Sequence, residues 1–195
     1  DIGPQLRACL ATAERLLAGA DQGLIYRQGA RVALVGRPNV GKSSLLNALL
    51  RADRAIVTPI PGTTRDTLEE TANLAGIPVV LIDTAGIHGS ADPVEQLGIE
   101  RSRSALANAD LALLVLDAQA PLGPDDHAIA ALTADQPTIV VWNKVDTPAT
   151  QPVSATADLG LHQLRAVVHT AARSGFGLAS LAQTIAATLL GGDLA

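Results

Sequence analysis

Residues 36–44 read Gly-Arg-Pro-Asn-Val-Gly-Lys-Ser-Ser, and this run fits the phosphate-loop pattern G-x-x-x-x-G-K-[ST]. The two pattern glycines let the backbone turn so that successive N–H groups point inward and form a nest for an anion. An apolar run at 31–35 is typical of the strand that precedes such a loop. Helix propensity from Ser43 to Leu50 places the positive end of a helix dipole at the same point. The alternative interpretation is a glycine turn that merely precedes a helix.

If the run is a phosphate loop, each of its residues has a distinct task. The ammonium of Lys42 reaches the β- and γ-phosphates and assists the reaction, and the hydroxyl of Ser43 is a ligand for Mg²⁺. The sequence therefore predicts that a nucleotide is held through its phosphates by Asn39, Val40, Gly41, Lys42, Ser43 and Ser44.

A second motif, Asp83-Thr-Ala-Gly86, directly follows the apolar residues 79–82. At a strand end, the Asp83 carboxylate can hold Mg²⁺ through water, and the Gly86 N–H can bond the γ-phosphate. An isolated Asp-x-x-Gly is commonly only a turn. Its place after a phosphate loop favours the nucleotide role.

A third motif, Asn143-Lys-Val-Asp146, follows the apolar run at 138–142. The Asp146 carboxylate can accept hydrogen bonds from the N1–H and the exocyclic amine of guanine, a donor pair that adenine lacks. Asn143 can tie this loop to the phosphate loop, and the stem of Lys144 can cover the base. The motif predicts selection of GTP over ATP; the alternative is a polar turn.

Two weaker segments complete the predicted site. In Thr58-Pro-Ile-Pro-Gly-Thr-Thr-Arg-Asp66, a hydroxyl can complete the Mg²⁺ ligands, and we assign this role to Thr64, with Thr63 beside the nucleotide. The alternative is a bent loop with incidental threonines. After the last predicted strand, Ala171, Ala172 and Arg173 line the base, and the Ala172 N–H can read guanine O6; an incidental loop is again the alternative.

Composition excludes several other classes of protein. A hydrophobic content of 48% with 17% charged residues is ample for a packed core, and a net charge of −5 argues against a nucleic-acid-binding surface. The single cysteine, Cys9, excludes a disulfide framework and indicates a reducing, cytoplasmic location. No apolar run approaches the roughly 18 residues of a membrane span, and the N-terminus reads like that of an excised fragment.

Strand and helix patterns alternate along the chain. Residues 2–17 carry an incomplete helical stripe, 18–29 read as turn and extended chain, and 147–156 read as a surface loop. We expect an α/β fold of the Ras-like P-loop NTPase class: a mostly parallel six-stranded sheet with one antiparallel edge strand and helices on both faces. We expect residues 1–29 to form the end of a helical-domain segment and a linker, and residues 30–195 to form a GTP-binding domain. The expected strands are 32–35, 67–74, 77–82, 111–116, 138–142 and 166–169, and the expected helices 43–50, 94–108, 125–134 and 178–190.

In this order, the motifs resemble the five guanine-nucleotide motifs of translation-factor-type GTPases. The runs at 36–50, Arg54-Ala-Ile-Val-Thr58, Pro61–Asp66, Asp83–Ile87 and Val94–Ser102 resemble the G domain of the MnmE (TrmE) family of tRNA wobble-uridine modification GTPases. The ribosome-assembly families Der and Era share the first motif. The resemblance covers about residues 30–190, and residues 1–29 resemble the end of that family's helical domain.

The resemblance implies a mechanism without the water-orienting Gln of Ras-like enzymes, because Ile87 stands at that position. It implies a K⁺ ion in place of an arginine finger, held by Asn39 and mostly by backbone carbonyls of Thr58, Ile60, Gly62 and Thr63. It also makes Glu95 the carboxylate that positions or polarises the attacking water, through a second water. From the residues alone, Asn39 is equally well a turn residue, and Glu95 is an acid favoured by the helix dipole.

The family also implies partners. These are a transient homodimer through the switch face and, in the full-length protein, a GidA-type flavoprotein and tRNA; no membrane is involved, and we expect no direct nucleic-acid contact here. The sequence departs from the family at His88, where an Arg is common, and at Ala171, which lacks the usual Ser hydroxyl. Three interpretations stay open: a GTPase of tRNA modification, a ribosome-assembly GTPase, and a nucleotide-dependent switch with negligible turnover.

Overall fold

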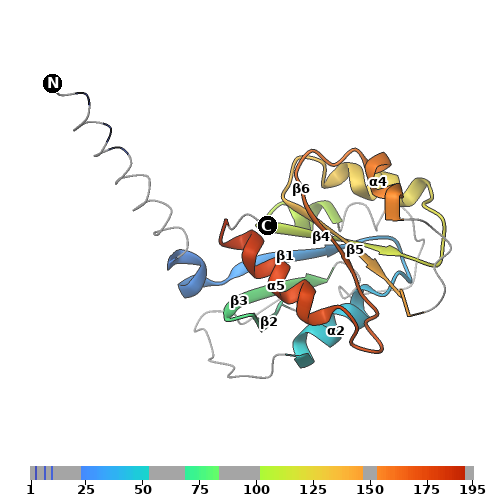
Figure 1. Ribbon diagram of the computed structural model, residues 1–195, viewed down its shortest axis with the longest axis horizontal. Helices are drawn as coiled ribbons and strands as arrows, with labels where there is room; N and C mark the ends of the chain where they lie inside the picture. The colour runs from blue at the N-terminus through green and yellow to red at the C-terminus, as the bar shows by residue number, and fades with distance from the viewer. Residues whose placement is uncertain are drawn as a thin grey trace.

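A six-stranded sheet with the order β2-β3-β1-β4-β5-β6 organises the molecule (Figure 1). This computed structural model describes Gly3, Arg7, Leu10 and residues 23–52, 69–83, 102–146 and 153–191. Every neighbouring pair of strands is parallel except β2 with β3. The expected mixed sheet is therefore confirmed, with strands β1 (Ala30–Val35), β2 (Glu69–Leu74), β3 (Ile77–Asp83), β4 (Leu111–Asp117), β5 (Thr138–Asn143) and β6 (Leu164–His169).

The antiparallel edge is a tight hairpin between β2 and β3. Ala75 and Gly76 form the two-residue link, with φ of +50° and +92°. Positive φ at both positions matches the twist of the two strands, so the link connects them without splaying them apart. The hairpin that the sequence predicted at this place is confirmed.

Helices cover both faces of the sheet, as expected. On one face, α2 (Lys42–Ala52) and α5 (Leu178–Leu189) enclose a core that includes Leu34, Leu45 and Leu181. On the other face, α4 (Pro124–Leu132) and helical residues 102–106 enclose a second core, which includes Leu114 and the buried Trp142. Alternate residues of β1 supply the two cores, because successive side chains of a strand point to opposite faces.

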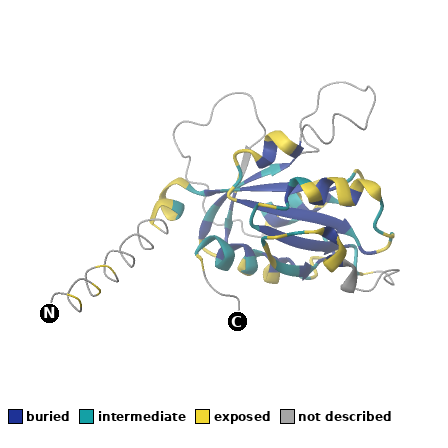
Figure 2. Cartoon of the chain, turned by 90° about the horizontal axis from the view of Figure 1, so that it is seen from above, coloured by how far each residue is buried: buried dark blue, intermediate teal, exposed yellow. Residues whose placement is uncertain are grey.

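The central strands are the most deeply buried part of the molecule (Figure 2). Every residue of β5 is buried, and so is every residue of β4 except Asp117 at its carboxyl end. A strand covered by helices on both faces reads as a continuous apolar run, which is why these two strands were readable from sequence. In β3, buried and half-buried residues alternate, so its second face is less completely covered.

Two segments differ from expectation. Residues 23–28 are helical rather than extended; the Gly29 N–H donates to the Ile25 carbonyl at 2.9 Å, and Gly29 has φ of +77°, as a glycine that ends a helix does. The predicted surface loop at 147–156 is also wrong in part, because η1 (Val153–Leu159) is a 3-10 helix. Its Leu159 is buried in the core beneath α4, and this tertiary packing outweighs the local preference for a loop.

The remaining described elements follow the predicted pattern. Of the helix expected at 94–108, residues 102–106 are helical and residues 107–108 form a turn, and Gly3, Arg7 and Leu10 are helical within the stripe at 2–17. Within the described part of the chain, no helix combines the length and the apolar character needed to cross a membrane. β1 lies at the switch point of the topology: the chain builds β2 and β3 on one side of it and β4 to β6 on the other. In sheets of this kind, ligands bind at the carboxyl ends of the strands near that point.

Candidate functional site

A cavity of about 770 Å³ opens at the carboxyl ends of β1, β4 and β5. Its walls come from four segments that are far apart in sequence: the phosphate-loop run, the loop after β4, the end of β5 with the residues that follow it, and the loop after β6. A volume of this size is typical of sites for nucleotide-sized ligands. The lining residues are Pro38, Asn39, Gly41, Lys42, Ser43, Ser44, Gln119, Asn143, Lys144, Asp146, Ala172 and Arg173.

Lys42 is held inside the loop that precedes it. Its ammonium donates hydrogen bonds to the carbonyls of Gly36 at 2.7 Å and Arg37 at 2.9 Å, and the residue is only 6% exposed. Burial lowers the pKa of Lys42, and the nearby Asp83 carboxylate opposes this shift. A buried ammonium in this surrounding is poised for an anion, because phosphate oxygens would supply the charge that the loop carbonyls lack.

Gly41 is required by the close approach of two loops. It has φ of +101°, which L side chains rarely adopt, and a Cβ at this position would press against the side-chain amide of Asn143. The absence of a side chain therefore lets the phosphate loop pack directly on the end of β5.

Ser43 and Asp83 meet at the start of α2. The Ser43 hydroxyl donates to the Asp83 carboxylate at 2.8 Å, so the end of β3 touches the first turn of the helix. A hydroxyl and a carboxylate side by side are hard oxygen ligands of the type that Mg²⁺ takes together with phosphate oxygens and water. These residues therefore fit Mg²⁺. Within the described ranges, no cluster of three or more His, Cys, Asp or Glu residues could hold a metal ion.

Asn143, at the end of β5, connects the phosphate loop with the loop after β6. Its side chain is 2% exposed; its amide N–H donates to the Val40 carbonyl at 2.9 Å, and its amide oxygen accepts from the Thr170 hydroxyl at 3.3 Å and the Ala172 N–H at 3.1 Å. The predicted tie between Asn143 and the phosphate loop is confirmed. The Ala172 N–H, which we assigned to guanine O6, has Asn143 as its partner in this structure.

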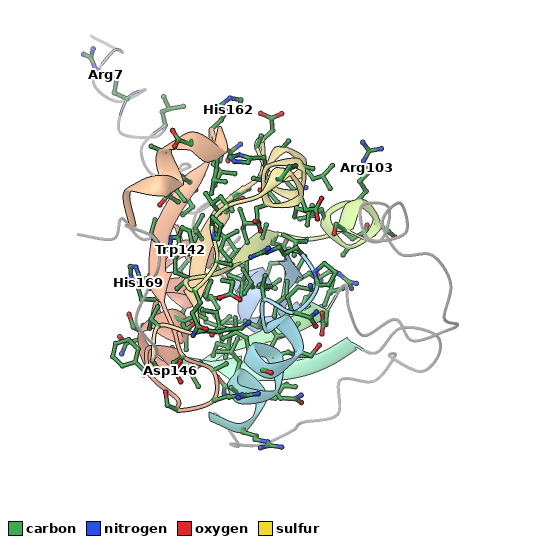
Figure 3. The ribbon with its side chains drawn as sticks, turned by 90° about the vertical axis from the view of Figure 1, so that its right-hand side faces the viewer. Arg7, Arg103, Trp142, Asp146, His162 and His169 are labelled. Atoms are coloured by element: carbon green, nitrogen blue, oxygen red, sulfur yellow. The ribbon has the colours of Figure 1, made fainter. Side chains whose placement is uncertain are left out.

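Lys144 and Asp146 line another part of the cavity wall. The Lys144 ammonium donates to the Asn39 carbonyl at 2.8 Å and pairs with the Asp117 carboxylate at 2.6 Å, so its stem lies across the cavity wall. Asp146 is exposed and lines the same cavity. In Figure 3, Asp146 lies toward the α2 end of the molecule and His162 at the opposite end. An exposed carboxylate at this edge is free to accept hydrogen bonds from a ligand that enters.

Sequence reasoning missed two lining residues, Pro38 and Gln119. Gln119 follows β4 by two residues, so the rule that sites gather at strand ends could have identified it. Val40, Asp83 and Ala171 are buried behind the cavity lining. The remaining predicted site residues lie outside the described part of the chain: Thr58, Ile60, Gly62, Thr63, Thr64, Gly86 and Glu95.

Comparisons with known proteins point to one family. The family model described as "50S ribosome-binding GTPase" matches residues 31–144. Proteins named "tRNA modification GTPase MnmE" are similar: that of Chloroflexus aurantiacus is 65% identical over 98% of this chain, and that of Roseiflexus sp. (strain RS-1) is 55% identical over 100% of it. The chain spans 42% and 44% of the length of these two relatives.

Solved structures with the same fold come from more distant proteins. The G domain of the T. maritima FeoB iron transporter has a TM-score of 0.55 and 27% identity, covering 80% of this chain and 96% of that domain. Elongation factor SelB from Methanococcus maripaludis, solved with the GTP analogue GppNHp, has a TM-score of 0.61 and 22% identity, covering 85% of this chain and 35% of SelB. At 22% identity, the likeness to SelB concerns the fold.

Proposed function

This chain belongs to the 50S ribosome-binding GTPase family, and from that premise we propose that it is the GTP-binding and GTP-hydrolysing domain of a cytoplasmic tRNA wobble-uridine modification protein. The observation that carries the proposal is that Lys42, Asn143 and Asp146 line one and the same cavity. The 65% identity to a protein named as a tRNA modification GTPase favours this role over ribosome assembly.

The geometry of the cavity supports binding of GTP. Lys42 and the N–H groups of the phosphate loop would bind the phosphates, Ser43 and Asp83, which are hydrogen-bonded to each other, would hold Mg²⁺, and Asp146, which lines the same cavity, would accept the two guanine donors. When bound, Mg²⁺ neutralises charge on the phosphate oxygens. Asn143 keeps the base-binding and phosphate-binding loops in register, because one side chain bonds both.

For hydrolysis, we assign Glu95 to the attacking water and Thr64 to the magnesium ligand set. The water oxygen forms a bond to the γ-phosphorus while the bond from that phosphorus to the bridging oxygen breaks, which releases GDP and phosphate. Asn39, with backbone carbonyls of Thr58, Ile60, Gly62 and Thr63, would hold K⁺. When bound, K⁺ supplies the positive charge that an arginine finger supplies in other GTPases.

Asn39 has features that suit either of its two interpretations. It is exposed, lines the cavity, and has φ of +65°, a conformation that Asn tolerates better than most residues and that is common in turns. Its backbone carbonyl accepts a hydrogen bond from the Lys144 ammonium, so a potassium ion would be held by the side chain of this lining residue. This placement supports Asn39 as a potassium ligand.

We further propose that two copies of the domain meet through their switch segments when GTP is hydrolysed, and that the full-length protein acts on tRNA with a GidA-type flavoprotein. The net charge of −5 supports a division of labour in which tRNA contacts are made outside this chain.

A phosphate-release assay tests the hydrolytic part of the proposal. Wild-type chain should turn GTP over much faster in K⁺ than in Na⁺. Glu95→Ala should lower turnover by roughly a hundredfold, the lower range for a residue that handles the attacking water, and keep GTP affinity. Glu95→Gln, which preserves size, is the matched control and should be equally slow. Equal turnover in the two salts would refute the potassium mechanism.

The biological role needs a separate experiment. In cells whose full-length protein carries Glu95→Ala, mass spectrometry of tRNA should show unmodified wobble uridine, while ribosomal subunit profiles stay normal. Normal tRNA with disturbed large-subunit profiles would replace our assignment with ribosome assembly.

A further inference from the structure

The loop after β4 contacts both the side-chain ammonium and the backbone carbonyl of Lys144. Asp117 accepts from the Lys144 ammonium at 2.6 Å, and the Gln119 side-chain amide donates to the Lys144 carbonyl at 3.0 Å. The Asp117 carboxylate is itself oriented, because its other oxygen accepts from the Gln119 N–H at 2.9 Å. Two side chains two residues apart thus hold the ammonium and the backbone of one lysine.

Lys144 needs such support because its backbone is strained. It has φ of +68°, in the left-handed region that side-chain-bearing residues avoid. Strain of this kind persists only where neighbouring contacts over-determine the conformation, and it gathers at ligand sites. The hydrogen bond to the Lys144 carbonyl acts on the strained residue itself.

These contacts also connect the residues after β5 with the phosphate loop. The same ammonium that pairs with Asp117 donates to the Asn39 carbonyl of the phosphate loop at 2.8 Å. Lys144 and Gln119 both line the cavity, and Asp146 lies two residues beyond Lys144. The side chain of Asp117 is 13% exposed and that of Lys144 35%, so solvent only partly screens the pair.

We propose that Asp117 and Gln119 are positioning residues for recognition of the base. This inference rests on the proposed function, since it assigns these residues to the guanine-binding half of a GTP site. By fixing the left-handed turn at Lys144, they set the lysine stem against the base plane and aim the Asp146 carboxylate at the base edge. The phosphates would be bound by a different set of groups, Lys42 and the N–H groups of the phosphate loop, so pyrophosphate affinity should depend on Asp117 and Gln119 far less than GDP affinity does.

The test compares ligands that share phosphates but differ in base. Calorimetric titration with GDP and pyrophosphate, each with Mg²⁺, is applied to wild type, Asp117→Ala and Gln119→Ala. We expect each variant to lose about tenfold in GDP affinity, typical of a lost hydrogen bond to a charged or strained group, and to change pyrophosphate affinity by less than about twofold. Asp135→Asn, at the opposite end of β5 with a side chain 91% exposed, is the matched charge control and should bind as wild type.

A double-mutant cycle shows whether Asp117 acts through Lys144. In a Lys144→Ala background, Asp117→Ala should have no further effect on GDP affinity, because the group it positions is gone. Additive losses in the cycle, or equal losses for GDP and pyrophosphate, would overturn the proposal. If Asp117→Ala does not fold by circular dichroism, Gln119→Ala decides the question alone. A wild-type chain that binds pyrophosphate and not GDP would refute the proposed function instead.

Discussion

Replacing Asn143 with alanine should lower the free energy of unfolding, because the Asn143 side chain connects two loops that line the cavity. The Asn143 side chain donates a hydrogen bond to the Val40 carbonyl of the phosphate loop. It also accepts hydrogen bonds from Thr170 and Ala172 in the loop after β6. Asn143→Ala removes all three hydrogen bonds at once. Because the residue is only 2% exposed, water has little access to the groups left behind.

The size of the effect follows from those contacts. A net hydrogen bond contributes about 1 kcal/mol, and a buried group left without its partner costs at least as much. With donor–acceptor distances of 2.9, 3.1 and 3.3 Å, the loss in the free energy of unfolding should be about 3 kcal/mol. For a domain of this size, that corresponds to a melting temperature lower by roughly 6–12 °C.

Urea unfolding of the nucleotide-free chain, followed by far-ultraviolet circular dichroism, measures this loss. Asn73→Ala is the matched control, because the Asn73 amide oxygen is buried without a hydrogen-bond partner in the described structure. We expect that variant to stay within about 1 kcal/mol of wild type. If Asn143→Ala were no more destabilising than Asn73→Ala, the reasoning that Asn143 stabilises the chain by connecting the phosphate loop with the loop after β6 would be refuted.

Two further predictions concern the phosphate loop. Burial lowers the pKa of Lys42 below 10.5, so its charge opposes folding below that lowered pKa, and the opposition fades as pH rises toward 10.5. The free energy of unfolding of wild type minus that of Lys42→Met, from urea titrations without nucleotide, should therefore increase over this range; a constant difference would contradict it. Gly41→Ala adds a clash to an unfavourable φ, whereas Gly175→Ala, at φ of +83° with open space around it, adds only the backbone cost of about 1 kcal/mol. Thermal unfolding should rank Gly41→Ala as clearly the less stable, and equal stabilities would show that the close loop approach does not matter.

Much of the fold could be predicted because its central strands carry unambiguous patterns. The runs at 111–117 and 138–143 are apolar throughout, which only burial on both faces explains. The hairpin at Ala75-Gly76 and the helix after Ser43 also follow from local chemistry. Each of the two central strands extends one residue beyond its expected end, because the polar residues Asp117 and Asn143 belong to the sheet although they interrupt the apolar run.

The segments that sequence reasoning got wrong depend on tertiary packing. η1 lacks a helical stripe, and its position is fixed by Leu159 beneath α4. The helix at 23–28 ends at Gly29, a stop signal that is also typical of a turn, and its Ile25 packs on the core formed by α2 and α5. Periodicity is weak in elements this short, so contacts with the rest of the chain decide their conformation.

The site was predictable where a motif carries its own chemistry. Asn143, Lys144 and Asp146 share one cavity with Lys42 as the motifs implied. Asp117 and Gln119 escaped notice because a strand-end carboxylate has many structural uses, and the ion pair to Lys144 spans 27 residues of sequence. No spacing rule connects two such positions before the strand pairing is known.

The central claim is that Asp146 selects a guanine base in this cavity, and exchanging the acceptor for a donor tests it most directly. Calorimetry with the diphosphates of guanosine, adenosine and xanthosine, with Mg²⁺ present, is applied to wild type and Asp146→Asn. We predict that wild type binds the guanosine nucleotide and not the adenosine one. We also predict that Asp146→Asn loses affinity for guanosine diphosphate and gains it for xanthosine diphosphate, whose C2 oxygen accepts from the new amide. Equal affinity of wild type for guanosine and adenosine diphosphates, or unchanged guanosine affinity in Asp146→Asn, would contradict the account.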